Sequence, residues 1–359
     1  MNKVTVPFFI SHQGCPHTCV FCDQRTISGS SGAVPTAEVI LEKIATWQRT
    51  AGERPLEVAF FGGTFTALPV TIQGQLLQPL QGLLENSVIA SIRVSTRPDC
   101  IDDETVKRLG QQGIKTIELG IQSMDDEVLK CSGRGHTAAA SDAAIHCIKS
   151  GGISVGAQLM PGLPGDTPLK SLYSLKRVIA DGVDFLRLYP VIVLRGTELA
   201  RRFQSGDYKP LTVEAGVQLC KVLLHEAMLA DVPVIRIGLQ ADAGLNETTV
   251  LGGCWHPSLG RLTRSELYFD LLCKLFLDIR AGLPCTILCH PSRVSEVTGQ
   301  GRINLKRLGE RMSSAQVKAD EDLMNVELAV ECAGRRIRGN IVTDLDYTMN
   351  EENICVRNH

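Results

Sequence analysis

Regular alternation of short apolar segments with longer amphipathic ones is the feature that most limits how this chain can fold. The apolar or β-branched segments predict strands at 3–10, 56–61, 91–96, 116–121, 153–159 and 185–189. The amphipathic segments between them predict helices at 36–50, 71–85, 102–112, 137–150 and 169–180. Repeated strand–helix units predict a parallel sheet with crossover helices, and the apolar runs predict strands that are covered on both faces. An open doubly wound sheet and a partial barrel both fit this pattern.

The pattern changes beyond residue 211. A long helix is expected at 213–230 and a strand at 234–238, followed by a glycine-rich stretch at 244–260 and a second long helix at 264–280. We interpret the glycine-rich stretch as the seam between two units. The sequence thus predicts a sheet domain over residues 1–243 and a smaller C-terminal domain over residues 244–359.

Composition limits the location and the partners of the chain. No apolar run approaches the roughly 18 residues needed to cross a bilayer, and the N-terminus lacks the pattern of a signal peptide, so we expect a cytoplasmic protein with no membrane partner. The chain has 37 Lys and Arg against 39 Asp and Glu, giving a net charge of −2. This balance excludes a uniformly basic nucleic-acid-coating protein but allows a local basic groove.

Three of the 13 cysteines lie together, in the loop after the first predicted strand. Cys15, Cys19 and Cys22 have three and two residues between them, which brings three thiolates onto one compact loop. Structural zinc takes four ligands, and most 4Fe–4S clusters take four cysteines. A cluster held by three leaves one iron open to a small molecule. The alternatives are a zinc site completed by His12 or His17, and chance packing.

Further motifs follow at the ends of the next five predicted strands. They read Phe-Phe-Gly-Gly-Thr at 60–64, Ser-Thr-Arg-Pro at 95–98, Glu-Leu-Gly-Ile-Gln-Ser at 118–123, Gln-Leu-Met-Pro-Gly-Leu-Pro at 158–164 and Leu-Tyr-Pro at 188–190, with Arg-Gly-His at 134–136. Together with the cysteine spacing, these motifs resemble the radical S-adenosylmethionine (SAM) superfamily over residues 1 to about 240. The resemblance implies an α/β fold, a partial (β/α)6 TIM-like barrel with a smaller C-terminal α/β extension. Its active face lies at the carboxyl ends of the strands.

The resemblance also implies the cofactors and the residues that hold them. A 4Fe–4S cluster on Cys15, Cys19 and Cys22 would bind SAM at its open iron and, reduced by a donor such as flavodoxin or ferredoxin, would generate a 5′-deoxyadenosyl radical. The SAM contacts are expected from eight residues: Phe21, Gly62, Gly63, Thr64, Ser95, Gln122, Arg134 and Gln158. Arg134 suits the SAM carboxylate because a planar guanidinium matches it in a bidentate fork. Gln158 is expected at the ribose. Phe21 is expected against adenine or packed beneath the loop.

The motif set is most similar to the Elongator catalytic subunit and its short bacterial relatives. That subunit carries an acetyltransferase domain, and we expect none here, because the chain ends at His359 without a glycine-rich acetyl-CoA loop. By analogy with this branch alone, we expect RNA, such as a tRNA, as the substrate. A tetrapyrrole or other small metabolite, as in coproporphyrinogen oxidase, is the alternative enzyme. A non-enzymatic iron–sulfur sensor is the alternative outside enzymes.

Three weaker features remain. Cys254, Cys285 and Cys289, near His256 and His290, suggest either a second metal site or ordinary buried cysteines. Basic residues gather at Lys306, Arg307, Arg311, Arg335, Arg336 and Arg338, on solvated faces or as contacts to an RNA backbone. Residues 236–240 also resemble the Elongator branch, with no role assignable from chemistry.

Overall fold

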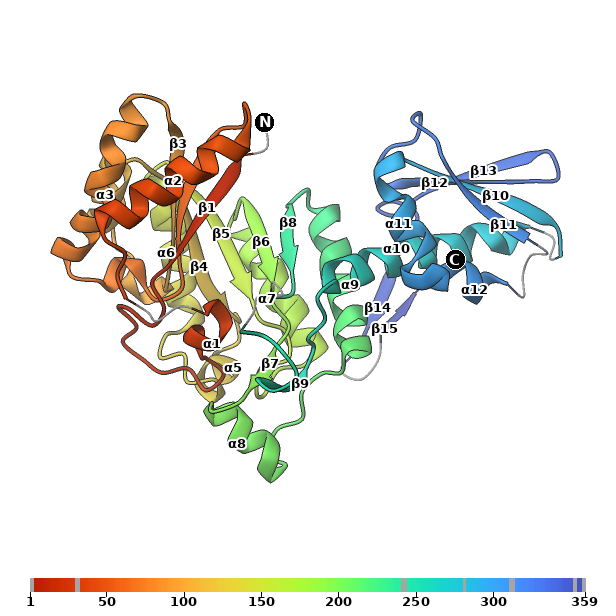
Figure 1. Ribbon diagram of the computed structural model, residues 1–359. Helices are drawn as coiled ribbons and strands as arrows, with labels where there is room; N and C mark the ends of the chain where they lie inside the picture. Colours follow the sequence, from red (N-terminus) through yellow and green to blue (C-terminus); the bar gives the residue numbers. More distant parts are fainter. Residues whose placement is uncertain are drawn as a thin grey trace.

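The structure is a computed structural model, which describes residues 3–29, 33–239, 244–279, 282–309, 314–350 and 354–356. Figure 1 shows two lobes, each built on a sheet, with helices α9 (Val213–Leu229) and α10 (Leu259–Leu275) between them. The larger sheet has seven parallel strands in the order β1-β2-β3-β4-β5-β6-β8. These strands are β1 (Val4–Phe9), β2 (Leu56–Phe61), β3 (Ile89–Thr96), β4 (Ile114–Gln122), β5 (Ser154–Leu159), β6 (Phe185–Leu188) and β8 (Val234–Ile237).

The sheet curls into an open partial barrel, which confirms the predicted fold class. Successive strands are connected by α2 (Ala37–Ala51), α3 (Val70–Glu85), α4 (Asp103–Gln111), α6 (Ala138–Ser150) and α7 (Pro168–Ala180). A doubly wound sheet would carry helices on both faces, whereas here the inner face lines a cavity. The strand predicted at 234–238 is β8, which pairs with β6 and adds a seventh strand to the expected six.

The middle strands carry charged residues on their inner face. On β4, Ile117 is fully buried in the apolar core, whereas the next residue, Glu118, lines the cavity. On β6, Leu186 is fully buried and the next residue, Arg187, lines the cavity. The sequence predicts strands covered on both faces, whereas the inner face lines a cavity in which these charges stand among apolar side chains such as Phe9 and Phe61.

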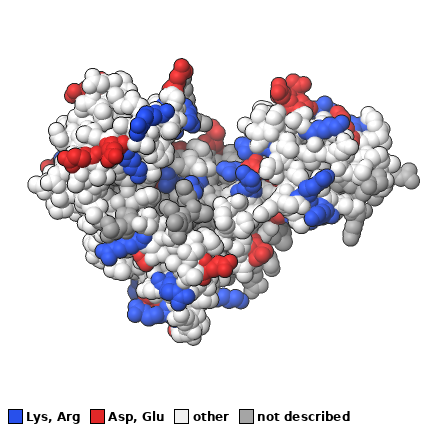
Figure 2. All heavy atoms as spheres, in the orientation of Figure 1, with Lys and Arg blue, Asp and Glu red and all other residues white. Residues whose placement is uncertain are grey.

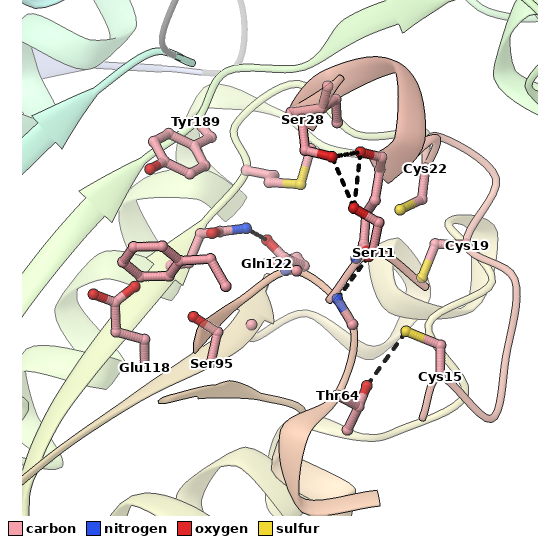
Figure 3. A pocket seen from close by; sticks show the side chains of 18 of the residues that line it. Ser11, Cys15, Cys19, Cys22, Ser28, Thr64, Ser95, Glu118, Gln122 and Tyr189 are labelled. Carbon is pink, nitrogen blue, oxygen red and sulfur yellow. Dashed lines mark hydrogen bonds between the residues drawn. The ribbon is translucent and has the colours of Figure 1, made fainter. Parts of the chain in front are cut away.

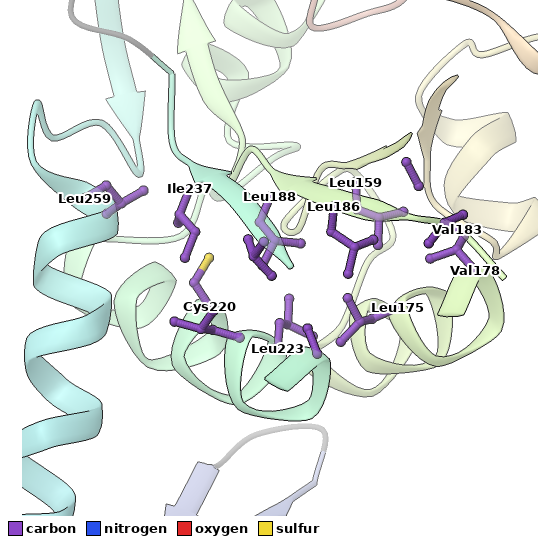
Figure 4. Packing of buried hydrophobic residues seen from close by; sticks show 14 of the residues in the cluster. Leu159, Leu175, Val178, Val183, Leu186, Leu188, Cys220, Leu223, Ile237 and Leu259 are labelled. Carbon is purple, nitrogen blue, oxygen red and sulfur yellow. The ribbon is translucent and has the colours of Figure 1, made fainter. Parts of the chain in front are cut away.

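The outer face of the sheet is held by packing against helices. Figure 4 shows Leu159, Leu186 and Leu188 of β5 and β6 facing Leu175 of α7 and Leu223 of α9. All five side chains are at most 2% exposed. Burying each one stabilises the fold by about 1.5–3 kcal/mol relative to exposure.

Side-chain caps explain why the helix starts were predictable to within a residue. Each cap accepts a hydrogen bond from the backbone N–H three residues on, which satisfies a donor that has no partner inside the helix. The capping residues of α2, α4, α6, α7 and α9 are Thr36, Asp102, Thr137, Thr167 and Thr212.

The smaller lobe contains a four-stranded sheet in the order β11-β10-β12-β13. Its strands are β10 (Pro284–Cys289), β11 (Ser314–Ala319), β12 (Glu327–Cys332) and β13 (Arg335–Asn340), with β14 (Tyr347–Met349) and β15 (Ile354–Val356) as a separate pair. Short helices α11 (Val294–Thr298) and α12 (Ile303–Leu308) pack beside α10. Within the described ranges, no helix is both long and apolar enough to span a membrane.

The glycine-rich stretch contains more structure than expected. Strand β9 (Val250–Gly253) pairs with β7 (Ile192–Leu194), and α10 begins at Leu259 instead of residue 264. The predicted end of that helix, residue 280, lies outside the described residues. Buried residues of both lobes belong to one contiguous core, and the division into domains 1–243 and 244–359 stays a prediction.

Candidate active site

The three cysteines lie on the loop between β1 and α1 (Gln24–Ser28), at the carboxyl end of the sheet. Figure 3 shows Cys15, Cys19 and Cys22 along one side of the cavity that fills the half-barrel. Cys15 Sγ lies 3.4 Å from Thr64 Oγ1, and the Cys22 backbone N–H donates to Cys19 O at 3.1 Å. The loop therefore presents its thiols to a single space.

The electrostatics of the three thiols favour a cationic occupant. Burial, followed by the neighbouring Cys19 and Cys15, raises the pKa of Cys22 to about 12. Three adjacent thiolates are unfavourable without a counter-charge, and metal coordination deprotonates thiols outright. In the described part of the chain, no three His, Cys, Asp or Glu side chains converge on one metal ion. A cluster binds each thiolate to a different iron and needs no such convergence, so the three cysteines fit a 4Fe–4S cluster.

Both histidines proposed as extra zinc ligands have other neighbours. His12 Nε2 accepts a hydrogen bond from the Gln24 backbone N–H at 2.9 Å. His17 packs against Gly135, where an added Cβ would lie 2.4 Å from the imidazole ring. The arrangement of these side chains gives no support to a four-ligand zinc site.

The double glycine after β2 fits against the cysteine loop. Gly63 has a φ of +56°, and a Cβ there would lie 2.4 Å from Gln13 O and 2.6 Å from Ile10 O. The Gly63 N–H donates to Gln24 Oε1 at 2.6 Å, and the Thr64 N–H donates to Gln13 O at 2.7 Å. Close approach of the loop backbone is thus what requires glycine at position 63. Gly62, at a φ of +72°, also lines the cavity.

Two glutamines meet across neighbouring strands. Gln158 Nε2 on β5 donates to Gln122 Oε1 on β4 at 3.1 Å, and both residues line the cavity. Gln122 has a φ of +72° beside a register shift in the β4–β5 pairing. Left-handed backbone is uncommon for a residue other than glycine and concentrates at functional sites.

Arg134 connects the cysteine loop to the end of β4. It is 5% exposed, its Nη1 donates to Cys19 Sγ at 3.1 Å, and its Nη2 donates to Gly120 O. Its Nε is buried with no acceptor among the described residues. Arg134 therefore keeps a buried cationic group beside the cysteines, as its expected contact with the SAM carboxylate requires.

Ser95 and Phe21 complete the expected set. Ser95 lies on the inner face of β3, in register with Glu118 of β4, and lines the cavity. Phe21 is 9% exposed and packs in a small apolar cluster with Val20 and Val128 beneath the cysteine loop. Its edge also reaches the cavity, so the adenine contact stays a prediction beside the packing role.

All 11 residues expected to bind the cluster or SAM line one cavity of about 640 Å³. Ligand pockets are typically about 300–1,000 Å³. The assignment of each residue to a particular cofactor atom stays a prediction.

Sequence reasoning missed two residues that hold this site together. Gln24 Oε1 accepts from the backbone N–H groups of both His12 and Gly63 and thereby ties the cysteine loop to the double glycine. Arg97 makes a bidentate ion pair with Asp99 and donates to Arg134 O. Gln24 lies two residues after Cys22, and Arg97 is part of the Ser-Thr-Arg-Pro motif at 95–98, but the sequence predicted no role for either.

Among the described residues, the cysteines of the C-terminal part belong to no group of three side chains that could hold one metal ion. Cys254 packs against Gly216 of α9, whereas Cys285 and Cys289 lie on β10. Cys285 faces Cys332 across the β10–β12 pairing. These positions favour ordinary buried cysteines, one of the two alternatives that the sequence left open, over a metal site at Cys254, Cys285 and Cys289.

The basic residues of the smaller lobe are mostly neutralised by acids. Arg336 pairs with Asp320 at 2.7 Å, Arg338 with Glu327 at 2.9 Å, and Arg307 with Glu266. Figure 2 shows basic and acidic side chains interspersed on this lobe. Arg311 lies outside the described residues. The described arginines therefore give no continuous basic surface for an RNA backbone.

Comparison with known proteins identifies the same family across most of the chain. The model of the radical SAM superfamily matches residues 9–170, and that of the radical SAM C-terminal domain matches residues 183–268. The chain is 27% identical to the uncharacterized protein MJ0486 of Methanocaldococcus jannaschii, over 73% of this chain and 82% of that protein. It is 26% identical to protein YhcC of Escherichia coli, over 66% of this chain and 75% of that protein.

Longer relatives match in part. The chain is 26% identical to a tRNA uridine(34) acetyltransferase of Dehalococcoides mccartyi, over 65% of this chain but only 59% of that protein. The structure resembles the Methanocaldococcus infernus Elp3 with an N-terminal deletion, with a TM-score of 0.57 at 20% identity, over 75% of this chain and 64% of that one. The chain belongs to the radical SAM superfamily, whose members are enzymes that bind a 4Fe–4S cluster and SAM, and its homologues are Elongator-like radical SAM domains and their short relatives.

Proposed function

We propose that the protein binds a 4Fe–4S cluster through Cys15, Cys19 and Cys22 and cleaves SAM reductively. One observation carries the proposal: the three thiols and all eight expected SAM residues line a single cavity. A bound and reduced cluster would supply the electron that cleaves the sulfonium C–S bond of SAM, giving methionine and a 5′-deoxyadenosyl radical for hydrogen abstraction from the substrate. The electron donor is a small redox protein such as flavodoxin or ferredoxin.

The residues of the chain bind and orient SAM. Arg134 pairs with the SAM carboxylate, and its buried Nε supports this role. The backbone carbonyls of Gly62 and Gly63 accept from the SAM ammonium group. Gln158, held by Gln122 at 3.1 Å, donates to or accepts from the ribose. Each of these groups is fixed by packing or hydrogen bonds before SAM arrives, which lowers the entropic cost of binding.

The substrate we infer is RNA, most specifically a tRNA. Support comes from relatives named as tRNA uridine(34) acetyltransferases, which match 46–65% of this chain. The chain spans 59% or less of the length of those relatives. Their acetyl-dependent reaction is therefore left out of the proposal, which is limited to the radical step on a tRNA nucleotide.

The radical chemistry is tested with anaerobically reconstituted protein. We expect iron and sulfide to be incorporated, SAM to perturb the spectrum of the cluster, and dithionite to release 5′-deoxyadenosine. Cys19→Ala should abolish all three, whereas Cys131→Ala, which removes an exposed cysteine that does not line the cavity, should leave them intact. A reconstituted cluster that SAM never perturbs would favour an iron–sulfur sensor instead.

The substrate is tested separately by mass spectrometry of tRNA nucleosides from a deletion strain and its parent. We expect one modified nucleoside to disappear from the deletion strain and to return when the wild-type chain is restored, but not when Cys19→Ala is. Identical nucleoside profiles would refute the tRNA substrate and leave the radical chemistry standing.

A further inference from the structure

The cavity contains a second group of polar side chains that the proposed function does not use. Four of them line the same cavity as the cysteines: Glu118 on β4, Arg187 on β6, Tyr189 directly after β6, and Arg236 on β8. In Figure 3, Glu118 and Tyr189 lie on the far side of Gln122 from the three sulfur atoms. These polar residues thus occupy the end of the cavity away from the cysteine loop.

Strand register explains why the two arginines are neighbours. Gln158, Arg187 and Arg236 are paired in one row across β5, β6 and β8, so their side chains lie on the same face of the sheet. β8 is the edge strand of this sheet. Arg236 therefore stands at the open side of the half-barrel, where a substrate can enter beside it.

The charges in this part of the barrel leave one cation unpaired. Arg93 pairs with both Glu57 and Glu118 at 2.7 Å, and Arg187 pairs with Glu118 at 3.0 Å. Among the described residues, no carboxylate lies within 4 Å of Arg236. In this part of the barrel, the two acids Glu57 and Glu118 thus lie beside three arginines, which are Arg93, Arg187 and Arg236.

The donors of Arg236 are also poorly used. Its one hydrogen bond to the described residues runs from Nε to Gly238 O at 3.3 Å, which leaves both terminal nitrogens without an acceptor there. Beside it, Arg187 Nη1 donates to the Tyr189 hydroxyl at 3.1 Å, and Arg187 Nε is buried with no acceptor in the described chain. Arg187 Nε, which is withdrawn from water, would gain most from an anionic partner, and the terminal nitrogens of Arg236, which are not fully buried, have donors left to bind one.

We propose that Arg236, with Arg187 and Tyr189 beside it, binds an anionic group of the substrate, a phosphate or a carboxylate. The proposal rests on the function proposed above, because it identifies the substrate end of the same cavity. A guanidinium binds both groups in bidentate fashion. The anchored substrate then extends toward Gln122 and Gln158, where SAM is expected.

Direct titration of the full-length, anaerobically reconstituted protein tests this subsite. Inorganic phosphate and succinate serve as the two probes, and isothermal titration calorimetry measures their affinity in wild type, Arg236→Gln and Arg236→Lys. The control is Arg335→Gln, which removes an exposed arginine of β13 in the other lobe. Circular dichroism checks that each variant is folded.

We expect at least one probe to bind wild type and Arg335→Gln equally, with affinity at least tenfold lower in Arg236→Gln and intermediate in Arg236→Lys. Binding of phosphate alone assigns a phosphate-bearing substrate, and binding of succinate alone assigns a carboxylate-bearing one. Absence of binding to wild type, equal affinity in Arg236→Gln, or an equal loss in Arg335→Gln would overturn the subsite. Failure of wild type to bind and cleave SAM is measured separately and would refute the proposed function instead.

Discussion

Replacing Gly63 with alanine tests the contact between the double glycine and the cysteine loop. Alanine at a φ of +56° costs about 1–2 kcal/mol in backbone strain alone. Its Cβ would lie 2.4 Å from Gln13 O, although real Cβ contacts essentially never fall below 3.0 Å, so the loop backbone must move by at least 0.6 Å. A movement of this size lengthens the 2.7 Å bond from the Thr64 N–H to Gln13 O to about 3.3 Å, near the limit of a hydrogen bond, and disturbs the 2.6 Å bond from the Gly63 N–H to Gln24 Oε1.

Complete loss of one hydrogen bond costs about 0.5–1.5 kcal/mol. Backbone strain and the loss of both bonds together would therefore lower the unfolding free energy by about 2–5 kcal/mol. Because the displaced segment leads directly into Cys15, we expect Gly63→Ala to lower both the unfolding free energy and the iron content after reconstitution. Gly301→Ala is the matched control: its φ is +60°, and nothing lies within 4 Å of an added Cβ, so it carries the backbone strain without the clash. Urea unfolding and iron analysis measure the two effects. Wild-type iron content in Gly63→Ala would refute this account of the loop.

Three further changes have definite expected outcomes. Arg134→Ala should retain iron but weaken SAM binding tenfold or more, because a hydrogen bond to a charged group contributes about 1.5–3 kcal/mol. Calorimetry measures the SAM affinity, and an unchanged affinity would remove Arg134 from the SAM site. Burial raises the pKa of Asp166 from 3.8 to about 6, so the carboxyl stays protonated to a higher pH in the folded state than in the unfolded state. The unfolding free energy should therefore fall as pH rises from about 4 to 6. In urea unfolding, Asp166→Asn should lack this fall, and parallel pH profiles of the two proteins would contradict the prediction. Lys221→Ala leaves the largely buried carboxylate of Asp270 with only the Tyr347 hydroxyl, at 2.9 Å, as partner, and should cost about 3 kcal/mol. Arg336→Ala breaks an exposed pair and should cost less than about 1 kcal/mol, and equal losses would refute the role of burial.

The elements that were predicted well are those with local signals. The helix that begins after Thr36 combines a capping side chain with apolar residues at helical spacing, and its observed range of Ala37–Ala51 differs from the prediction by one residue at each end. The third strand was predicted two residues short: Ile89 and Ala90 are apolar and belong to the strand, but the prediction began at Ser91. The start of α10 was missed because its first turn, from Leu259, contains glycine and lacks a side-chain cap.

Inward-facing charges were present in the sequence but were not recognised. Arg93, Glu118, Arg187 and Arg236 each stand between apolar neighbours on a strand, which is the period of two that marks a polar face. Each strand was treated as a continuous apolar run, because most of its residues are apolar, and this alternation was therefore missed. These charges marked the face of the sheet that lines the cavity.

Sequence by itself determined the family and the chemistry: the spacing of Cys15, Cys19 and Cys22 and the motifs at successive strand ends depend only on the order of residues along the chain. Tertiary structure alone decided which side chains share the cavity and which charges there remain unpaired. Arg187 and Arg236 are 49 positions apart, and only the pairing of β6 with β8 makes them neighbours. Strand register and barrel curvature arise from packing across the whole sheet, so no local pattern encodes the excess positive charge opposite the cysteine loop.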